Sequence, residues 1–451
     1  DREARRVEPS TGCCGRTPRG RFRPMSNFNA LPGFRDFFPD DLAVRTHVMR
    51  AWRDVARRYG FQEYDGPPLE PLELYTEKSG PEIVQQLYNF TDKGGREITL
   101  RPEMTPTLAR MAGARAGGFR KPMKWFSVPQ LFRYERQQRG RLREHFQLNF
   151  DIIGEEDVAA DAELLAAAID ILRTLGLTAQ DFVARVSDRR LLRALLLDAG
   201  VPEDQLALAY NIVDKLERDT PEAIAARLTG EAGVSGEVAA AVLAIFQHTD
   251  FAAVTREYGG RPGIAPELER MERYFGFLRD MGLGDFVRFD LTVVRGLAYY
   301  TGIVFELFDT RGELRAICGG GRYDDLLKRI AGVDLPALGF GMGDVVLTEL
   351  LRDRKLLPDP KPVLDFYLAA AGPEQRGAVL ALAHQLRDAG HSVEYSFVEA
   401  GRNRQFKNAS ALNARRVAWL GPDEVAAGEA LVRDTGTGEE RRIPLAELAR
   451  P

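Results

Sequence analysis

The first element that the sequence predicts is a helix whose apolar residues recur every three or four positions. These residues are Val44, Val48, Trp52, Val55 and Tyr59. Gly60 follows directly and is expected to end the helix. The next stretch, FQEYDGPPLEP, predicts a short strand that Pro67 and Pro68 interrupt, which places it at a sheet edge or an interface.

A strand running into a helix is predicted from REITLRPEMTPTLARM, with Thr105 as the N-cap residue and Pro106 at the first helical position. Two further strands, KWFSVPQLFRYER and EHFQLNFDIIG, flank the basic loop RQQRGRLR. In the first of them, alternation puts Arg133 and Glu135 on one strand face. Residues 160–175 are expected to form an amphipathic helix.

The middle of the chain is predicted to be a helical insertion between strands. Residues 188–285 contain successive helical patterns and few strand signals. Strands resume in LTVVRGLAYYTGIVFELFD, residues 291–309, whose alternation predicts a half-buried strand with Arg295, Leu297, Tyr299 and Thr301 on one face. LRAICGGGRYDDLL and ALGFGMGDVVLTELL follow. Strands on both sides of an insertion imply an antiparallel or mixed sheet, hence an α+β domain, rather than a βαβ series.

A second, smaller domain is predicted after segment 352–362, which is charged and rich in proline, as linkers are. Beyond it come the strand VLDFYLAAA, a helix over about 374–389, the strand HSVEYSFV, a helix over about 402–414 and the strand RRVAWLG. This alternation indicates a small α/β domain with a partly parallel sheet.

The composition is that of an ordinary soluble globular protein, with 44% apolar and 28% charged residues among 451. The length suffices for two or three domains. The net charge is −4, so any polyanion must be met by local basic patches. Three cysteines and five scattered histidines form neither a disulfide framework nor a metal-ligand set, which favours a reducing, cytoplasmic location.

Residues 1–24 are polar and lack both an initiator Met and the apolar core of a secretory signal. We expect a disordered leader or an artificial extension, with Met25 as the natural start, and a basic arm that contacts RNA is the alternative. No apolar run reaches the roughly 20 residues that span a bilayer, so no membrane partner is expected.

Four stretches carry candidate chemistry. Arg295 has apolar and aromatic neighbours and needs an anion, because an unpaired charge removed from water is costly. Glu103 and Thr105 stand at a strand-to-helix junction, where helix capping alone would also explain them. The arginine-rich loop after Arg133 suits a phosphate, although a salt-bridged surface hairpin would use the same residues. Gly319–Gly321 permit unusual backbone conformations and the close approach of a ligand, and a tight turn is the alternative.

Together these stretches resemble one family. FRYER…GRLREHFQ is similar to motif 2 of class II aminoacyl-tRNA synthetases, and VVRGLAYYTGIVFE resembles the histidine-specific segment of histidyl-tRNA synthetases. LRPEMTPTLAR and GGGRYD resemble other segments of that family, and Pro67 stands at the place of the motif 1 proline in the dimer interface. The resemblance covers about residues 26–451 and includes a C-terminal anticodon-binding domain.

The resemblance implies ATP-dependent ligation of L-histidine to tRNA(His) through a histidyl-adenylate, with Mg²⁺, by a homodimer with a class II catalytic domain. It implies that Arg295 and Arg133 hold the α-phosphate, that Arg295 also meets the histidine carboxylate, and that Glu135 helps to place the nucleotide or the tRNA terminus. Positioned cations lower the barrier because two negative groups approach each other in the in-line attack.

For histidine, the implied binding residues are Glu103 and Thr105 for the α-amino group, Gln147 for the carboxylate region, Asp151 and Tyr300 for the imidazole, and Tyr299 and Tyr323 as lining. For tRNA, the basic loop 136–143 is implied to meet the acceptor end through Arg136, Gln138 and Arg139. The segment GRNRQFKNASALNARR, residues 401–416, suits the anticodon through Arg402, Arg404 and Lys407, and a solvated helix face is the alternative.

Two positions depart from the family's pattern. Val346 stands in the register of an arginine that binds the γ-phosphate, so Arg141, Arg143 and Mg²⁺ are candidates for that role. His145 stands where an adenine-stacking Phe is expected, with Phe146 beside it, and either ring could serve.

The main alternative is a synthetase-like regulatory subunit of ATP phosphoribosyltransferase in histidine biosynthesis, which does not charge tRNA. The missing arginine at Val346 favours it. Arg133, Glu135, Gln147, Arg295 and the C-terminal domain argue against it. A nucleotide-binding module with a P-loop has little support, since Gly-Lys-Ser/Thr does not occur.

The expected organisation is a leader (1–24), a first catalytic part with motifs 1 and 2 (25–187), the helical insertion (188–285), a second catalytic part (286–351), the linker (352–362) and the anticodon-binding domain (363–451).

Overall fold

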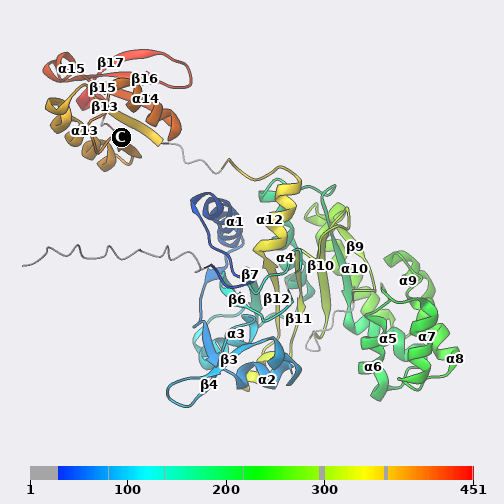
Figure 1. Ribbon diagram of the computed structural model, residues 1–451. Coiled ribbons are helices and arrows are strands. Elements are labelled where there is room, and N and C mark those ends of the chain that lie inside the picture. Colours follow the sequence, from blue (N-terminus) through cyan, green and yellow to red (C-terminus); the bar gives the residue numbers. More distant parts are fainter. Residues whose placement is uncertain are drawn as a thin grey trace, which may run out of the picture.

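The computed structural model describes residues 29–79, 81–136, 138–216, 218–293, 300–359, 364–448 and 450 (Figure 1). The strands of the N-terminal part are β1 (Gln62–Glu63), β2 (Leu69–Pro71), β3 (Tyr88–Thr91), β4 (Glu97–Leu100), β5 (Met123–Ser127), β6 (Gln130–Phe132), β7 (Glu144–Ile153), β8 (Phe182–Asp188), β9 (Val287–Phe289), β10 (Ile303–Asp309), β11 (Cys318–Arg322) and β12 (Ala337–Gly343). Its helices are α1 (Pro39–Arg58), α2 (Glu73–Ser79), α3 (Thr105–Arg115), α4 (Val158–Thr174), α5 (Arg189–Asp198), α6 (Leu206–Val213), α7 (Pro221–Gly230), α8 (Gly236–Ile245), α9 (Phe251–Tyr258), α10 (Ala265–Asp280), α11 (Leu326–Ala331) and α12 (Asp344–Asp353).

The main sheet has nine strands in the part of the chain that the structure describes. Eight follow the order β1-β5-β7-β12-β11-β10-β8-β9, and β6 pairs with β7. The β1–β5 and β8–β9 pairs are parallel and the other pairs are antiparallel. The prediction of an antiparallel or mixed sheet in an α+β domain is therefore confirmed: the sheet is mixed and mostly antiparallel. The stretch with Pro67 and Pro68 leads from the edge strand β1 to β2, an edge strand of the smaller sheet β2-β4-β3.

One face of the main sheet packs against α1, α4 and α12. As predicted, α1 buries Val48, Trp52 and Val55 at helical spacing, and Gly60 follows with a φ of 73°. Helix α4 was expected to be amphipathic, and this is wrong: it is buried along the unbroken run Leu164–Ile169. It lies between the sheet and the helices α1 and α10, so water reaches little of it.

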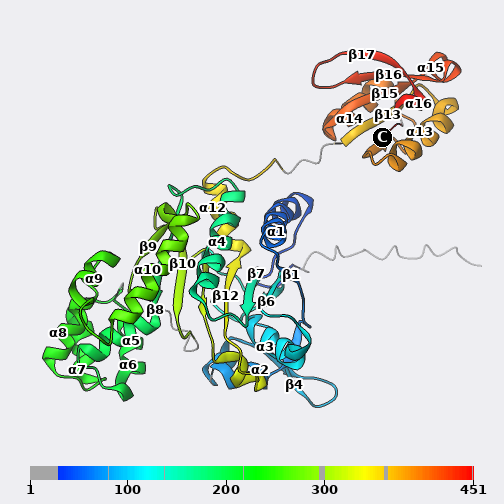
Figure 2. The same ribbon diagram turned by 180° about the vertical axis from the view of Figure 1, so that it is seen from behind.

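The predicted helices between residues 188 and 285 are α5 to α10, which gather beside the β8–β9 end of the sheet (Figures 1 and 2). Four of them begin with a side-chain N-cap, in which Asp188, Thr220, Ser235 or Asp250 accepts a backbone N–H of the first turn. Strong local start signals and apolar stripes explain why this part could be recognised from the sequence.

The half-buried strand predicted over 291–309 is wrong in two respects. The strand β10 begins only at Ile303, and it is buried on both faces, because it lies inside the sheet between β8 and β11. Arg295 and Tyr299 lie outside the described residues.

Three local expectations also need correction. Met104, not Thr105, is the N-cap residue of α3, and it caps with no side-chain hydrogen bond. The KWFSVPQLFRYER stretch forms two strands, and β6 ends at Phe132, so Arg133 and Glu135 lie beyond it. Gly319–Gly321 are neither a turn nor in the left-handed region: they lie in β11, where a Cβ at Gly320 would stand 2.4 Å from the Phe340 Cβ.

The C-terminal part forms a five-stranded sheet among its described residues, in the order β14-β13-β15-β16-β17. Its strands are β13 (Leu364–Ala370), β14 (Val393–Tyr395), β15 (Ala414–Leu420), β16 (Glu429–Asp434) and β17 (Glu440–Pro444), and its helices are α13 (Arg376–Asp388), α14 (Arg402–Ala411), α15 (Pro422–Ala427) and α16 (Leu445–Leu448). β13 is parallel to β14 and β15, so the predicted partly parallel α/β sheet is confirmed.

Two helices cover opposite faces of this smaller sheet. Phe366 and Leu368 of β13 pack with α13, whereas Tyr367 and Ala369 pack with α14. This double cover explains why the VLDFYLAAA strand is apolar without alternation. In the described residues of the whole chain, no helix is both long and apolar enough to cross a membrane.

Candidate active site

Strand β7 supplies one wall of the site through alternate residues. Leu148, Phe150 and Ile152 point into the core with α1 and α4. His145, Gln147, Asn149 and Asp151 therefore share the opposite face of the strand. Three of these four were predicted to bind ATP or histidine, and the strand brings them into one row.

The floor beside this row is made by glycines of the neighbouring strand β12. A Cβ at Gly339 would stand 2.2 Å from Asp151 Oδ1, and one at Gly341 would stand 2.7 Å from Gln147 Nε2. The missing side chains are thus what leaves room for Asp151 and Gln147. These glycines were not among the predicted site residues, although the alternation GFGMG, with glycine at every second residue, already indicates a strand with one bare face.

Aromatic residues surround Asp151. The Tyr323 hydroxyl donates a hydrogen bond to Asp151 Oδ1, and both side chains are buried. Tyr323, Tyr300 and Trp125 belong to the same apolar cluster, which lies between the sheet and the helices α3 and α11. Tyr64 packs against it, and burial together with the charge of Asp151 raises the pKa of the Tyr64 hydroxyl well above its ordinary value. Trp125 and Tyr64 were not among the predicted site residues.

Arg133 lies at the other end of the β7 row. Its Nε donates to the Pro102 carbonyl at 2.9 Å, which places it beside the segment that contains Glu103 and Thr105. Burial, together with the positive charges of Arg133 and Arg35, lowers the pKa of His145 to about 3. His145 is thus a neutral ring close to Arg133 at physiological pH.

Phe146 points to the other side of β7. Its ring lies 6.1 Å from that of Phe37, and the Arg45 guanidinium stands 4.4 Å from its centroid. Of the two rings considered for adenine, the geometry therefore favours His145, which shares the face of Gln147 and Asp151.

The basic loop after Arg133 is held by its own charges. Arg141 forms an ion pair with Glu135 through Nε and Nη2, and the Arg143 guanidinium lies 4.2 Å from the Tyr134 ring centroid. Arg136 and Gln138 are exposed. The salt-bridged hairpin considered as an alternative is therefore present. Arg141 and Arg143 nevertheless remain partly exposed to solvent.

The loop also packs against α12. A Cβ at Gly140 would stand 3.2 Å from Val346 Cγ2, and Arg139 forms ion pairs with Glu349 at 3.2 Å and Asp353 at 3.4 Å. Val346 is buried. Val346, predicted to stand in the register of the motif 3 arginine, thus lies against the loop that resembles motif 2.

The start of α12 is fixed by a charge cluster of two buried carboxylates and one partly buried arginine, which no local sequence pattern indicated. Arg35 Nε donates to Glu144 at 2.6 Å, and Arg35 Nη1 donates to Asp344 at 3.0 Å. Asp344 also accepts the Phe146 N–H at 2.9 Å. This cluster joins α12 to the start of β7 and so sets the distance between Val346 and the loop.

In the C-terminal part, Arg402, Arg404 and Lys407 are exposed on α14. The Arg402 guanidinium lies 4.9 Å from the Trp419 ring centroid. The three cations thus share one helix, as the sequence predicted.

Comparison with known proteins agrees with this architecture. The family profile described as Histidyl-tRNA synthetase matches residues 33–344, and the profile described as Anticodon binding domain matches residues 365–450. Relatives named histidine--tRNA ligase include one from Opitutus terrae, 44% identical over 93% of this chain and 97% of the relative. Another is a chloroplastic/mitochondrial protein of Arabidopsis thaliana, 39% identical over 95% of this chain and 87% of the relative.

Solved structures share the fold. A histidyl-tRNA synthetase from Nostoc sp. PCC 7120 superposes with a TM-score of 0.80 at 24% identity, over 94% of this chain and 98% of that chain. The Staphylococcus aureus histidyl-tRNA synthetase superposes with a TM-score of 0.68 at 22% identity, over 94% and 98% of the two chains. With the profile match over most of its length and the relatives named above, this chain belongs to the histidyl-tRNA synthetase family of class II aminoacyl-tRNA synthetases.

Proposed function

We propose that the chain ligates L-histidine to tRNA(His) through a histidyl-adenylate intermediate. The observation that supports this most directly is the buried pair of Asp151 and Tyr323 over the glycine floor of β12, in the same row as Gln147 and His145. The Asp151 carboxylate and the Tyr323 phenol lie at one end of the β7 row, and Arg133 lies at the other. This arrangement suits an amino acid with a polar aromatic side chain.

The imidazole is recognised by Asp151. Its carboxylate accepts a hydrogen bond from Tyr323, which fixes its orientation, and it would accept another from an imidazole N–H. Tyr300 belongs to the same cluster as Tyr323 and is also assigned to the imidazole. Leucine or phenylalanine would leave the buried carboxylate without that partner, and such sites reject the wrong substrate strongly.

The polar ends of the substrates are assigned to the other end of the row. Glu103 and Thr105 bind the α-amino group, and Gln147 lies beside the carboxylate. In the first step a carboxylate oxygen of histidine attacks the α-phosphorus of ATP, a new P–O bond forms, and pyrophosphate leaves. Arg133 and Arg295 neutralise the charge that gathers there, and a guanidinium suits this role because its fork is planar and always charged.

Four further residues contact ATP in this proposal. His145 lies against the adenine, and Glu135 helps to place the nucleotide or the tRNA terminus. Arg141 and Arg143 serve the γ-phosphate in place of the family's motif 3 arginine. Mg²⁺ would be held mainly by the phosphate oxygens of ATP and would neutralise part of their charge. Among the residues that the structure describes, no group of three or more His, Cys, Asp or Glu side chains could hold a metal.

We assign tRNA contacts to the loop residues Arg136, Gln138 and Arg139 at the acceptor end, and to Arg402, Arg404 and Lys407 at the anticodon. Arg139 would have to exchange Glu349 and Asp353 for a phosphate. We further propose a homodimer that includes Pro67 at its interface, a cytoplasmic location, and the six-part division of the chain given above.

The regulatory-subunit alternative is not favoured, since the relatives are named histidine--tRNA ligase and the anticodon-binding profile matches the C-terminal part. ATP–pyrophosphate exchange dependent on histidine tests the point, because a regulatory subunit shows none. Aminoacylation of purified tRNA with each of the twenty amino acids tests the specificity. Charging with histidine alone is expected, and charging with any other amino acid at a comparable rate would contradict the proposal.

Within this reaction, Arg295→Lys keeps the charge of Arg295 and loses its fork. Adenylate formation should fall by more than about tenfold, equivalent to about 1.4 kcal/mol. A smaller loss would remove Arg295 from the reacting centre.

A further inference from the structure

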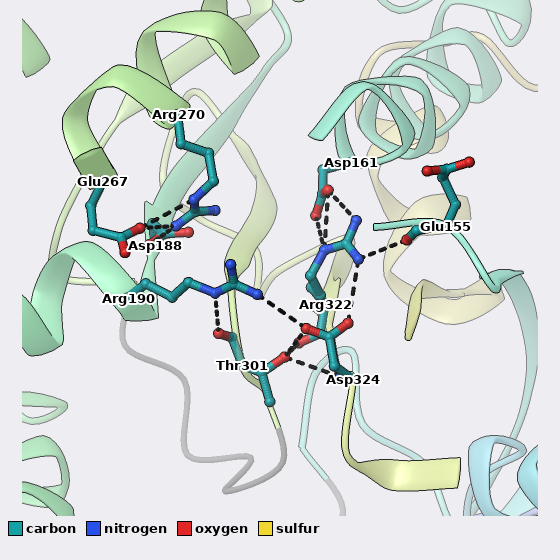
Figure 3. Close-up of polar contacts among 9 residues, drawn as sticks. All are labelled: Glu155, Asp161, Asp188, Arg190, Glu267, Arg270, Thr301, Arg322 and Asp324. Atoms are coloured by element: carbon teal, nitrogen blue, oxygen red, sulfur yellow. Dashed lines mark hydrogen bonds and ion pairs between the residues drawn. The ribbon is translucent and has the colours of Figure 1, made fainter. Parts of the chain in front are cut away.

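Arg322, at the end of β11, is a buried cation held in one orientation. It is 3% exposed, and its main partner Asp161 on α4 is 4% exposed. Arg322 Nε lies 3.1 Å from Asp161 Oδ1 and Nη2 lies 2.5 Å from Oδ2, while Nη1 donates to the Glu155 carbonyl at 2.8 Å (Figure 3). A guanidinium paired through two of its nitrogens has little freedom to turn. The backbone at residue 322 is therefore fixed to the core helix α4.

The residue on the other side of Tyr323 is fixed as well. Thr301 Oγ1 donates to Asp324 Oδ2 at 3.0 Å and accepts the Asp324 N–H at 3.1 Å. The Thr301 N–H also donates to the Arg322 carbonyl at 2.8 Å. Tyr323, whose hydroxyl meets Asp151, is thus held between two anchored neighbours.

Arg190 joins this arrangement to the helical insertion. It lies in the first turn of α5, and its side chain reaches the Thr301 carbonyl and Asp324 Oδ2, both at 3.3 Å (Figure 3). The start of α5 is itself fixed, because Asp188 caps it and accepts a hydrogen bond at 2.7 Å from Arg270 of α10. Two helices of the insertion are therefore connected, through Arg190, to the residues that flank Tyr323.

We propose that Arg322 and Arg190 are positioning residues for the imidazole pocket and act through Tyr323. Through Arg190, the affinity for histidine then depends on the position of the helical insertion relative to the sheet. This inference rests on the proposed function. Neither arginine touches a substrate. Each instead restricts the motion of the segment that carries Tyr323. A mobile Tyr323 hydroxyl could not keep the Asp151 carboxylate in the orientation that binds the imidazole.

Arg190 gives the sharper test. Its side chain is 46% exposed, so Arg190→Met should leave the fold intact, whereas loss of Arg322 would leave Asp161 as an unpaired buried charge. The matched control is Arg193→Met on the same helix, where Arg193 is 50% exposed and pairs with Glu203, away from the pocket.

Purified full-length variants are compared in ATP–pyrophosphate exchange. Arg190→Met should raise the KM for histidine by about 3- to 10-fold, the range expected for losing hydrogen bonds to a partly exposed charged group. Its KM for ATP should stay within twofold, and Arg193→Met should change neither. A distortion of the whole active site would raise both KM values together, and that result, or an unchanged KM for histidine, would overturn the inference.

The route through Tyr323 is tested by a double-mutant cycle. In a Tyr323→Phe background, Arg190→Met should have little further effect on the KM for histidine, because the hydroxyl that it positions is gone. Two effects that simply multiply would overturn the route.

Different measurements distinguish a failure of the proposed function from a failure of this inference. A wild-type protein without histidine-dependent exchange would contradict the function. The same comparison would then be made on the Kd for histidine by calorimetry, where an unchanged Kd in Arg190→Met overturns the inference.

Discussion

Gly339 lies directly opposite Asp151 in the β7–β12 ladder, and a Cβ at residue 339 would stand 2.2 Å from the Asp151 carboxylate and 2.6 Å from the Phe150 carbonyl. The pocket is thus defined on this side by the absence of a side chain. The carboxylate could swing away from a new methyl group, but the carbonyl belongs to the sheet and could not.

Gly339→Ala should therefore impair histidine activation. Overpacking of this kind costs about 1–3 kcal/mol, which corresponds to a loss of about 5- to 160-fold in kcat/KM for histidine. Gly343→Ala is the control on the same strand, because a Cβ at Gly343 would meet no atom within 4 Å. ATP–pyrophosphate exchange measures both, and equal activities would show that Asp151 does not need the space.

Asp151→Ala should raise the KM for histidine by about 10- to 100-fold, since it removes the charged group that accepts a hydrogen bond from Tyr323 and would accept another from the imidazole. The KM for ATP should change far less. Asp170→Ala is a suitable control, because Asp170 accepts a similar hydrogen bond from Tyr59 at 2.7 Å, outside the site. Equal changes in the two KM values would remove Asp151 from the imidazole pocket.

The lowered pKa of His145 predicts a pH dependence of stability. The unfolded chain binds a proton at residue 145 below pH 6.5, whereas the folded protein resists it down to about pH 3. Stability from this residue is therefore complete above pH 6.5 and falls with decreasing pH, by at most about 1.4 kcal/mol per pH unit.

The His145→Phe variant should lose less stability than wild type between pH 6.5 and 4.5. Thermal unfolding across this range measures the difference, and the carboxylates that titrate in both proteins cancel. His384→Phe, at a position 80% exposed on α13, serves as the control and should follow wild type. Parallel curves for all three proteins would mean that His145 accepts a proton in the fold.

The cations of α14 should matter for tRNA and not for adenylate formation. Arg404→Met and Lys407→Met should each weaken tRNA binding and lower the slope of log affinity against log salt by about one. Arg441→Met on β17, 74% exposed and paired with Glu439, is the control. A tRNA affinity that responds equally to all three variants would point to general charge rather than to an interface on α14.

Much of the fold could be predicted from local patterns. The periodicity of α1, the N-caps of the insertion and the apolar strands of the C-terminal sheet each depend on residues close together in sequence. The extent of β10 and the burial of α4 could not be predicted, because both depend on what covers them. The alanine-rich helix α4 was predicted to be amphipathic because its sequence does not show that α1 and α10 cover the face turned away from the sheet.

The part of the site that lies on one strand could be predicted, because its residues are close together in sequence. Gln147 and Asp151 belong to one strand, and Tyr323 is brought to Asp151 by the fold. Arg35, Arg190 and Arg322 had no local signal, since their partners lie far away in sequence. Ion pairs between residues far apart in sequence leave no local pattern from which a single sequence could predict them.

The cluster around Asp344 has a consequence for where the folded unit starts. Arg35 stands before α1, yet two carboxylates of the sheet and of α12 depend on it for neutralisation. The four residues before the first helix are thus part of the catalytic body. A version of the protein trimmed to begin at Pro39 would keep the helices and strands described above, but the buried carboxylates of Glu144 and Asp344 would lose their ion pairs with Arg35.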